Sequence, residues 1–165
     1  NAQVSPSSVS AARSSQIEVE KAAQERAVQG LDPDARKRAE DVASRFAQAM
    51  NARTWQTSRQ QWREALAPTV SPELLKTLDV DRDWESDAQH RFVQARASTS
   101  VQVLEARAQT VQGERVDVAL MVATETTGED PWVTAPRTER PMTVVVDTTQ
   151  NRVVAQIDMT PHGGL

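Results

Sequence analysis

The stretch WQTSRQQWREALAPTVSPELLKTL, residues 55–78, decides how the chain folds. It predicts a helix that begins at Thr57 or Ser58 and ends at Ala67, because Pro68 lacks the backbone donor that a continuing helix needs. Apolar side chains recur along one side of this helix, and we expect its tryptophans to be core anchors more often than the lining of a ligand pocket. These side chains are Trp55, Trp62, Ala65 and Leu66.

A second short helix follows in the same stretch. Ser71 stands at the position of a helix cap, and Pro72 at the first helical position, where proline is favoured. Leu74, Leu75 and Leu78 are spaced so that they share one face, which we expect to be buried. The stretch therefore predicts a helix, a corner and another helix.

The segment before this corner, LDPDARKRAEDVASRFAQAM, predicts an amphipathic helix. Asp32 is the expected cap, Pro33 the first residue, and the helix should end near Asn51. Its apolar positions recur every three or four residues and form one stripe, rich in small side chains that allow close approach to a sheet. The stripe consists of Ala35, Ala39, Val42, Ala43, Phe46, Ala47 and Met50.

From about Phe92 the apolar period changes to two, and β-branched residues replace alanine, which predicts strands. The expected strands are 99–111, 115–124, 142–147 and 152–159, joined in two places by short turns that favour antiparallel neighbours. Between Val103 and Leu104 the apolar residues change face, which predicts a β-bulge that curves the sheet. The fold class is therefore α+β, with about three N-terminal helices on one face of a curved four-stranded antiparallel sheet.

Residues 1–30 contain little that could be buried, and we expect them to be a tether, helical from Ser15 to Val28. The folded domain should span residues 31–160, with a tail at 161–165. Because the chain begins at Asn1 and not at methionine, we expect it to be a fragment or a processed product that a membrane span precedes. The chain itself has no apolar run of the roughly 20 residues that cross a bilayer.

Composition excludes several classes of function. The formal charge of -4 is spread along the chain, so direct binding of nucleic acid is not expected. There is no cysteine, which excludes disulfides, thiolate metal sites, iron–sulfur clusters and cysteine nucleophiles. We expect no cofactor.

The segment DVDRDWESDAQH, residues 79–90, superficially resembles a calcium loop, because its acidic residues alternate. Glycine is required at the sixth position, where Trp84 stands, and glutamate at the twelfth, where His90 stands. We therefore expect a solvated acidic connector with no metal. The alternating residues are Asp79, Asp81 and Asp83.

Residues for catalysis are scarce. His90 and His162 are the only histidines, they lie far apart, and neither has the spacing of a zinc site. The chain has no nucleophile elbow, phosphate loop or dinucleotide fingerprint, and it has no tyrosine. We expect no enzyme, although an Asp–His site that includes His90 stays open as an alternative.

The longest loop, TTGEDPWVTAP, carries Trp132 between two prolines. An exposed tryptophan in a polar loop is a candidate contact residue, because tryptophan is enriched at the centres of interfaces. We expect Trp132, with Pro131 and Val133, to form an interface. Packing of the same tryptophan against the sheet is the alternative.

The corner and the strands that follow it resemble the cone-shaped fold of nuclear transport factor two, also seen in cystatin. More narrowly, residues 31–160 resemble the extracytoplasmic domains of TcpC-like and TraM-like conjugation proteins of Gram-positive bacteria, which are related to the VirB-type assembly factor of type IV secretion. The residues that carry the resemblance are Trp62, Leu66, Pro68, Ser71, Pro72, Leu74 and Leu78.

This resemblance implies a single-pass membrane protein whose domain lies outside the cytoplasmic membrane and helps to assemble a DNA-translocation channel. It also implies contacts with other channel proteins, self-association as a dimer or trimer, and no catalytic residues. TcpC-like proteins can carry two such domains, and this chain carries one. An Mce-associated membrane protein and a small-ligand-binding or enzymatic domain on the same fold remain alternatives. The expected core comprises Phe46, Trp62, Leu66, Leu74 and Leu78.

Overall fold

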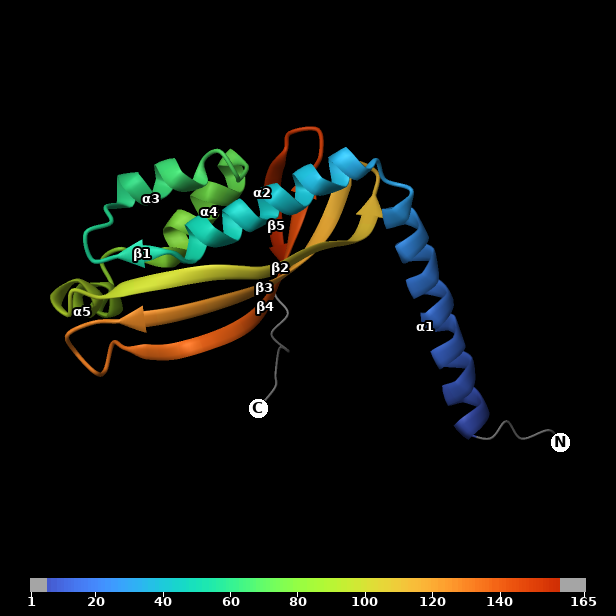
Figure 1. Ribbon diagram of the computed structural model, residues 1–165, viewed down its shortest axis with the longest axis horizontal. Coiled ribbons are helices and arrows are strands. Elements are labelled where there is room, and N and C mark those ends of the chain that lie inside the picture. The colour runs from blue at the N-terminus through green and yellow to red at the C-terminus, as the bar shows by residue number, and fades with distance from the viewer. Residues whose placement is uncertain (1–5, 158–165) are drawn as a thin grey trace.

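The computed structural model describes residues 6–157, which form five helices and one five-stranded antiparallel sheet of order β1-β2-β3-β4-β5 (Figure 1). The α+β class and the curved antiparallel sheet are confirmed. The helices are α1 (Pro6–Gln29), α2 (Pro33–Asn51), α3 (Arg59–Leu66), α4 (Pro72–Arg82) and α5 (Asp87–Gln94). The strands are β1 (Arg53–Thr54), β2 (Ser98–Gln112), β3 (Arg115–Thr127), β4 (Ala135–Asp147) and β5 (Arg152–Ile157).

Helix α2 begins at Pro33 and ends at Asn51, as predicted, although the Asp32 side chain makes no capping hydrogen bond. Its apolar stripe packs against β2 and β3. Alanines on this stripe allow the helix to lie close to the sheet, and Phe46 fills the remaining space. The buried residues of α2 are Ala39, Val42, Ala43, Phe46 and Ala47.

The corner between α3 and α4 has the caps that its sequence predicts. Ser58 forms a capping box with Gln61 at the start of α3, and the Ser71 side chain accepts a hydrogen bond from the Leu74 backbone at the start of α4. Between the helices, the Ser71 N–H donates to the Val153 carbonyl at 2.9 Å, and the Val153 N–H donates to the Thr69 carbonyl at 2.8 Å. The corner is thereby tied to β5.

The bulge expected in the first long strand is confirmed. The register of β2 against β3 shifts between Val103 and Glu105, and shifts again between Ala108 and Thr110. Each shift returns apolar side chains of β2 to the helix-covered face, where Val103 pairs with Val122. The β2–β3 hairpin turns at Gly113, whose φ of 61° favours glycine.

Several expectations are corrected. The described residues form five helices where about three were expected, and a short strand β1 adds a fifth strand. Helix α1 extends well before Ser15, to Pro6. Phe92 lies in α5 and not in a strand, since the Ser86 side chain caps a new helix there. The division at residue 30 into tether and domain stays a prediction.

Strand β4 begins at Ala135, seven residues before the strand expected at Met142. Pro136 and Pro141 hid this part of the strand, because proline normally argues against a central strand. Among residues 6–157 this part of the strand lies at an edge, because β5 pairs there only with residues Thr143 to Asp147. The end of the predicted fourth strand and His162 lie outside the described residues.

The core has two parts. The main cluster contains Phe46, Trp62, Leu66 and Leu78, with Leu74 partly buried against it. A smaller cluster is formed by Phe92, Ala95 and Ala97. Trp55, which was expected beside Trp62, precedes α3 and is 36% exposed, because it lies in the turn that Thr54 and Thr57 close between β1 and α3.

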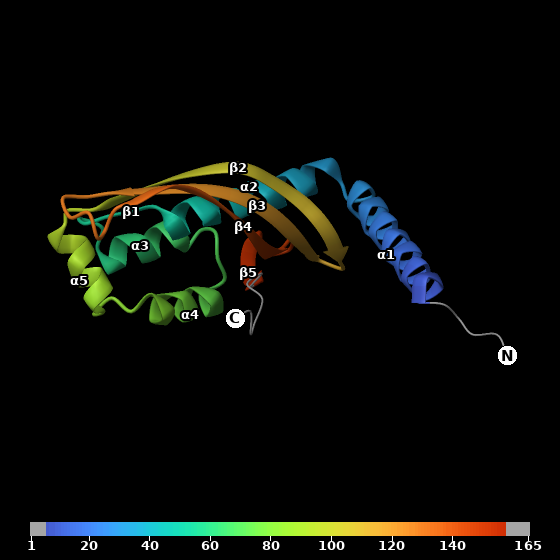
Figure 2. The same cartoon turned by 90° about the horizontal axis from the view of Figure 1, so that it is seen from below.

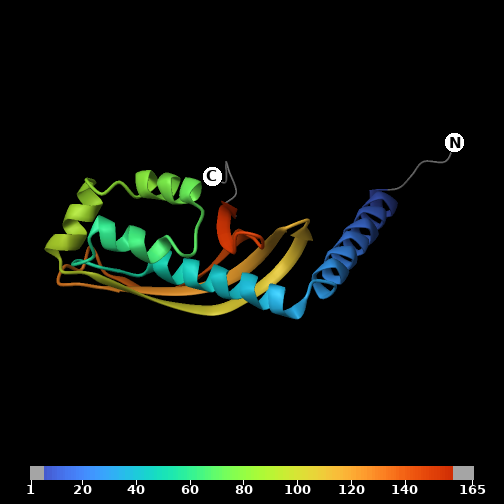
Figure 3. The same ribbon diagram turned by 90° about the horizontal axis from the view of Figure 1, so that it is seen from above.

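The elements form two layers. Helices α2, α3 and α4 lie on one side of the sheet, which curls toward them at β5 (Figures 2 and 3). Helix α1 leaves the body at one end, and α5 with the β3–β4 loop lies at the other (Figure 1). None of the helices described, over residues 6–157, has the length and apolar character of a membrane span.

Candidate functional site

The candidate contact residue Trp132 is 93% exposed at the tip of the β3–β4 loop. Its backbone N–H donates to the Asp130 carboxylate at 3.0 Å, and the Thr134 hydroxyl donates to the Pro131 carbonyl at 2.8 Å. The Val133 N–H also donates to the Asp130 carbonyl. The loop therefore holds a defined turn around a tryptophan that points away from the core.

The base of this loop is seated on the smaller apolar cluster. The Glu129 N–H donates to the Ala95 carbonyl at 2.7 Å, and Val133 packs against Phe92 and its neighbours. At Gly128, an added Cβ would lie 3.2 Å from the Ala97 Cβ, so the approach of the two backbones requires a small residue. A seated loop loses little conformational entropy when a partner binds it.

The three residues expected to form an interface therefore differ in their exposure. Trp132 and Pro131 are exposed, whereas Val133 is turned toward the apolar cluster and supports the loop from beneath. Charged residues Arg137, Glu139 and Arg140 follow on the exposed edge of β4. The arrangement of an apolar centre and a polar surround is typical of a protein contact site.

The acidic segment 79–90, which begins within α4, was expected to be solvated, and at Asp79 this expectation is wrong. Asp79 is only 4% exposed, and its carboxylate accepts a 2.6 Å hydrogen bond from Arg59 and a 2.7 Å hydrogen bond from Arg63. The Arg59 Nε also donates to this carboxylate, and the Trp84 indole donates to it at 3.0 Å. The hydrogen bonds from Arg59 hold the pKa of Asp79 below its ordinary value, against the effect of burial. Asp79 thus joins α4 to α3.

The other members of the calcium-like pattern take different positions. Asp81 is exposed, and Asp83 ends α4 in the left-handed conformation, with φ of 49°. Over the part of the chain that the structure describes, no group of three histidine, cysteine or acidic side chains is placed to hold a metal ion.

His90 is exposed on α5. Its side chain makes no hydrogen bond or ion pair with any of the residues described, so no Asp–His pair forms around it there. The other histidine, His162, cannot be placed because it lies outside residues 6–157. The Asp–His site that was kept as an alternative is therefore not assembled among the described residues.

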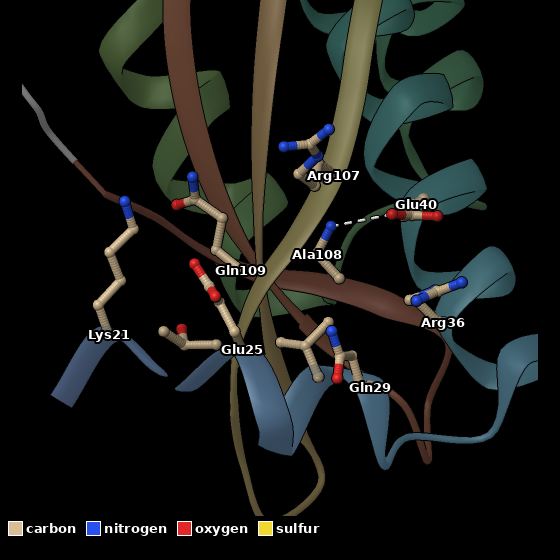
Figure 4. Close-up of a pocket in the computed structure, with 10 residues that line it drawn as sticks. Lys21, Glu25, Gln29, Arg36, Glu40, Arg107, Ala108 and Gln109 are labelled. Carbon is tan, nitrogen blue, oxygen red and sulfur yellow. Dashed lines mark hydrogen bonds between the residues drawn. The ribbon is translucent and has the colours of Figure 1, made fainter. Parts of the chain in front are cut away.

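A cleft of about 550 Å³ separates the end of α1 from β2 (Figure 4). Charged side chains of both signs line it, among them Lys21, Glu25 and Arg107. Glu40 has a structural role here: its carboxylate accepts a 2.9 Å hydrogen bond from the Ala108 N–H, at the second register shift of β2. Sequence reasoning missed this contact, because Glu40 reads only as a polar position on α2.

No protein-family model matches the chain, and no curated protein sequence matches it. Solved structures do. CagV of Helicobacter pylori, a VirB8 homologue of a type IV secretion system, aligns with a TM-score of 0.54 and 10% identity, covering 73% of this chain and 95% of CagV. The transfer protein TraH of the Gram-positive conjugative plasmid pIP501 aligns with a TM-score of 0.50 and 7% identity, covering 76% of this chain and 96% of TraH.

A third structure, the intermembrane space region of the chloroplast protein ARC6, reaches a TM-score of 0.49 at 14% identity, which is too weak to carry an argument. The first two alignments confirm the expected likeness to proteins of conjugation and type IV secretion at the level of the fold. The chain therefore has the nuclear transport factor two-like fold, the α+β arrangement it shares with TraH and CagV.

Proposed function

We propose that the protein is a non-enzymatic assembly component of a conjugative type IV secretion apparatus, acting through protein contacts on the extracytoplasmic side of a membrane. The observation that carries the proposal is the fold shared with CagV and TraH, which each align over nearly their whole length. Fold alone does not determine function, so the proposal also needs a surface that suits assembly.

The Trp132 loop supplies such a surface. A large amphipathic ring is held out by a hydrogen-bonded turn, and the apolar cluster beneath keeps that turn in place. Burial of tryptophan at the centre of an interface often contributes about 2 kcal/mol or more to binding. Helix α1 leaves the body at the opposite end, so a partner can reach the loop without displacing it (Figure 1).

The partner in this proposal is another protein of the channel, and further copies of the chain join it as a dimer or trimer. In this proposal the contact is made mainly by the apolar side chains of Pro131 and Trp132, which are exposed at the tip of the loop. Acid–base catalysis has no part in the proposal, in line with the isolated position of His90.

The test places a photo-crosslinking amino acid at position 132 in the native envelope and identifies the products by mass spectrometry. We expect crosslinks to a named channel protein or to a second copy of the chain. The matched control is position 80, where Val80 is an apolar side chain 70% exposed on α4, and there we expect no such product. Equal crosslinking at both positions, or none at 132, would count against the loop.

A second experiment measures association directly. Trp132→Ala should weaken self-association or partner binding by about 10-fold or more, while the free energy of unfolding changes by less than about 0.5 kcal/mol. Val80→Ala should change neither quantity. Unchanged association in Trp132→Ala would remove the loop from the interface, whereas a gene neighbourhood without a secretion ATPase or relaxase would argue against the apparatus itself.

A further inference from the structure

A second cavity, of about 400 Å³, opens between helices α2 and α4 and strands β2 and β3. Part of its wall is apolar and includes Met50, Trp62 and Leu78. The remainder is polar, with two arginine side chains and threonine hydroxyls. A cavity of this size, with an apolar part and polar groups beside it, has properties of a small-molecule site.

The first arginine, Arg82, lies against two aromatic rings. Its guanidinium carbon is 3.9 Å from the ring centroid of Trp84 and 4.9 Å from that of Trp62, and its buried Nε has no hydrogen-bond partner among the described residues. Burial and the nearby charge of Arg53 lower its pKa to about 10, with Asp79 acting in the opposite direction. The positive charge of Arg82 is therefore only partly compensated by the two aromatic rings.

The second arginine, Arg53, follows α2 and is half-buried. Its guanidinium carbon lies 3.9 Å from the Phe92 ring centroid, and its hydrogen bond to Gln89 is long, at 3.5 Å. Burial lowers the pKa of Arg53 as well.

Neither arginine has a carboxylate partner within ion-pair distance in the described part of the chain. Asp79, the nearest buried carboxylate, is already shared by Arg59 and Arg63. Asp81 also lines the cavity but is exposed and pairs with neither Arg53 nor Arg82. Two partly buried cations that repel each other therefore face one cavity.

A carboxylate is the chemical group best suited to neutralise these two positive charges. Guanidinium groups bind carboxylates through paired hydrogen bonds, and such bonds strengthen where water is partly excluded. Thr124, whose side chain makes no hydrogen bond with any described residue, adds a hydroxyl at the same cavity. Thr99 and Thr126 bond to each other at 2.8 Å.

We propose that this cavity binds a small organic carboxylate, with the charged group on Arg53 and Arg82 and an apolar body against Met50, Trp62 and Leu78. The apolar wall should favour this ligand over an inorganic anion, because an inorganic anion can bind the two arginines but has no apolar part to contact the wall. The proposal is independent of the Trp132 loop, which lies outside the cavity lining, so either can fail without the other.

The test is a calorimetric titration of the full chain with octanoate, 1-octanol and inorganic phosphate. Octanoate should bind, and the other two should bind at least about 10-fold more weakly, because each lacks one of the two features that the cavity recognises. Arg53→Gln and Arg82→Gln should each weaken octanoate binding by about 10- to 100-fold, the loss expected for a hydrogen bond to a charged group. Arg140→Gln, an exposed arginine on β4, is the matched control and should bind as the wild type does.

Circular dichroism reports whether each variant is folded. Should Arg82→Gln unfold, Arg53→Gln decides the question, and backbone amide shifts of the wild type at Thr124 under octanoate give a result without any substitution. Three outcomes would overturn the proposal: octanol or phosphate binding as tightly as octanoate, Arg140→Gln weakening binding as much as Arg53→Gln, or octanoate shifting no resonance of the cavity.

Discussion

The substitution Asp79→Asn tests the join between α3 and α4. It removes a negative charge from a side chain that is 4% exposed, and it preserves the size of the group and an oxygen that can accept from Trp84. What is lost is the charge that Arg59 and Arg63 both contact. The corner between α3 and α4 should then keep its packing and its backbone hydrogen bonds to β5, but lose the two ion pairs.

The expected loss lies between two limits. Removing one partner of a buried ion pair costs about 3–5 kcal/mol, and exposed pairs are worth about 0–1 kcal/mol. Asp79 is buried, but the arginine side chains are 57% and 47% exposed, so water solvates them when the carboxylate is gone. We therefore expect a decrease of about 2–3 kcal/mol in the free energy of unfolding near neutral pH.

The dependence on pH gives a second readout. The folded-state pKa of Asp79 is depressed, so its contribution is complete above the unfolded-state value of about 3.9 and is lost as the pH falls through the lower folded value. The difference between the wild type and Asp79→Asn should accordingly shrink in that acid range. Urea unfolding near neutral pH and at several acid pH values measures both quantities.

The matched control is Asp81→Asn, on the same helix. Asp81 is exposed and forms no ion pair with the described residues, so its substitution should change the free energy of unfolding by less than about 0.5 kcal/mol. If the two variants were equally stable, or if the loss in Asp79→Asn persisted unchanged into acid, the role given to the Asp79 carboxylate would be refuted.

Two further substitutions test the core and the loop by urea unfolding. Trp62→Ala should lower the free energy of unfolding by about 3–5 kcal/mol, because the side chain is 2% exposed. Trp55→Ala, at a residue 36% exposed, should lower it by less than about 1 kcal/mol. Similar losses in the two variants would contradict the burial of Trp62 and the exposure of Trp55. Gly128→Ala should cost about 1–3 kcal/mol, since its Cβ would meet the Ala97 Cβ at 3.2 Å and the Ala95 carbonyl at 3.3 Å, and unchanged stability would mean that the loop base is not tightly seated.

Features encoded over a few neighbouring residues could be predicted from the sequence. Pro33, Ser58 and Ser71 are found at the starts of their helices because capping depends on the next three or four residues. The bulge after Val103 was visible because a change in the phase of apolar residues must change the face of the strand. The fold class follows from such signals taken together.

Where the local signal was weak, the prediction failed. Helix α5 has eight residues and buries one of them, Phe92, so its period could not be told from a connector or a strand. The first half of β4 was hidden by Pro136 and Pro141, which are tolerated because, within the described residues, β5 does not pair with that part of the strand. Whether a strand is an edge is a property of the whole sheet.

The sites depended almost entirely on contacts between distant segments. Trp132 stood out in the sequence as a tryptophan in a polar loop, but its exposure and the inward position of Val133 follow from the way α5 lies beneath the loop. The cavity with Arg53 and Arg82 had no local signature, since one arginine follows α2 and the other ends α4.

The sequence by itself determined the α+β class, the limits of α2 and α3, the antiparallel pairing of the strands and the bulge of β2. These features rest on hydrogen bonds and side-chain periods within one segment. The tertiary structure decided that Asp79 is buried while Asp81 is exposed, that Trp62 is buried while Trp55 is not, and that two arginines share a cavity. Burial and charge compensation are set by the neighbours that folding brings together, and these neighbours are not adjacent in the chain.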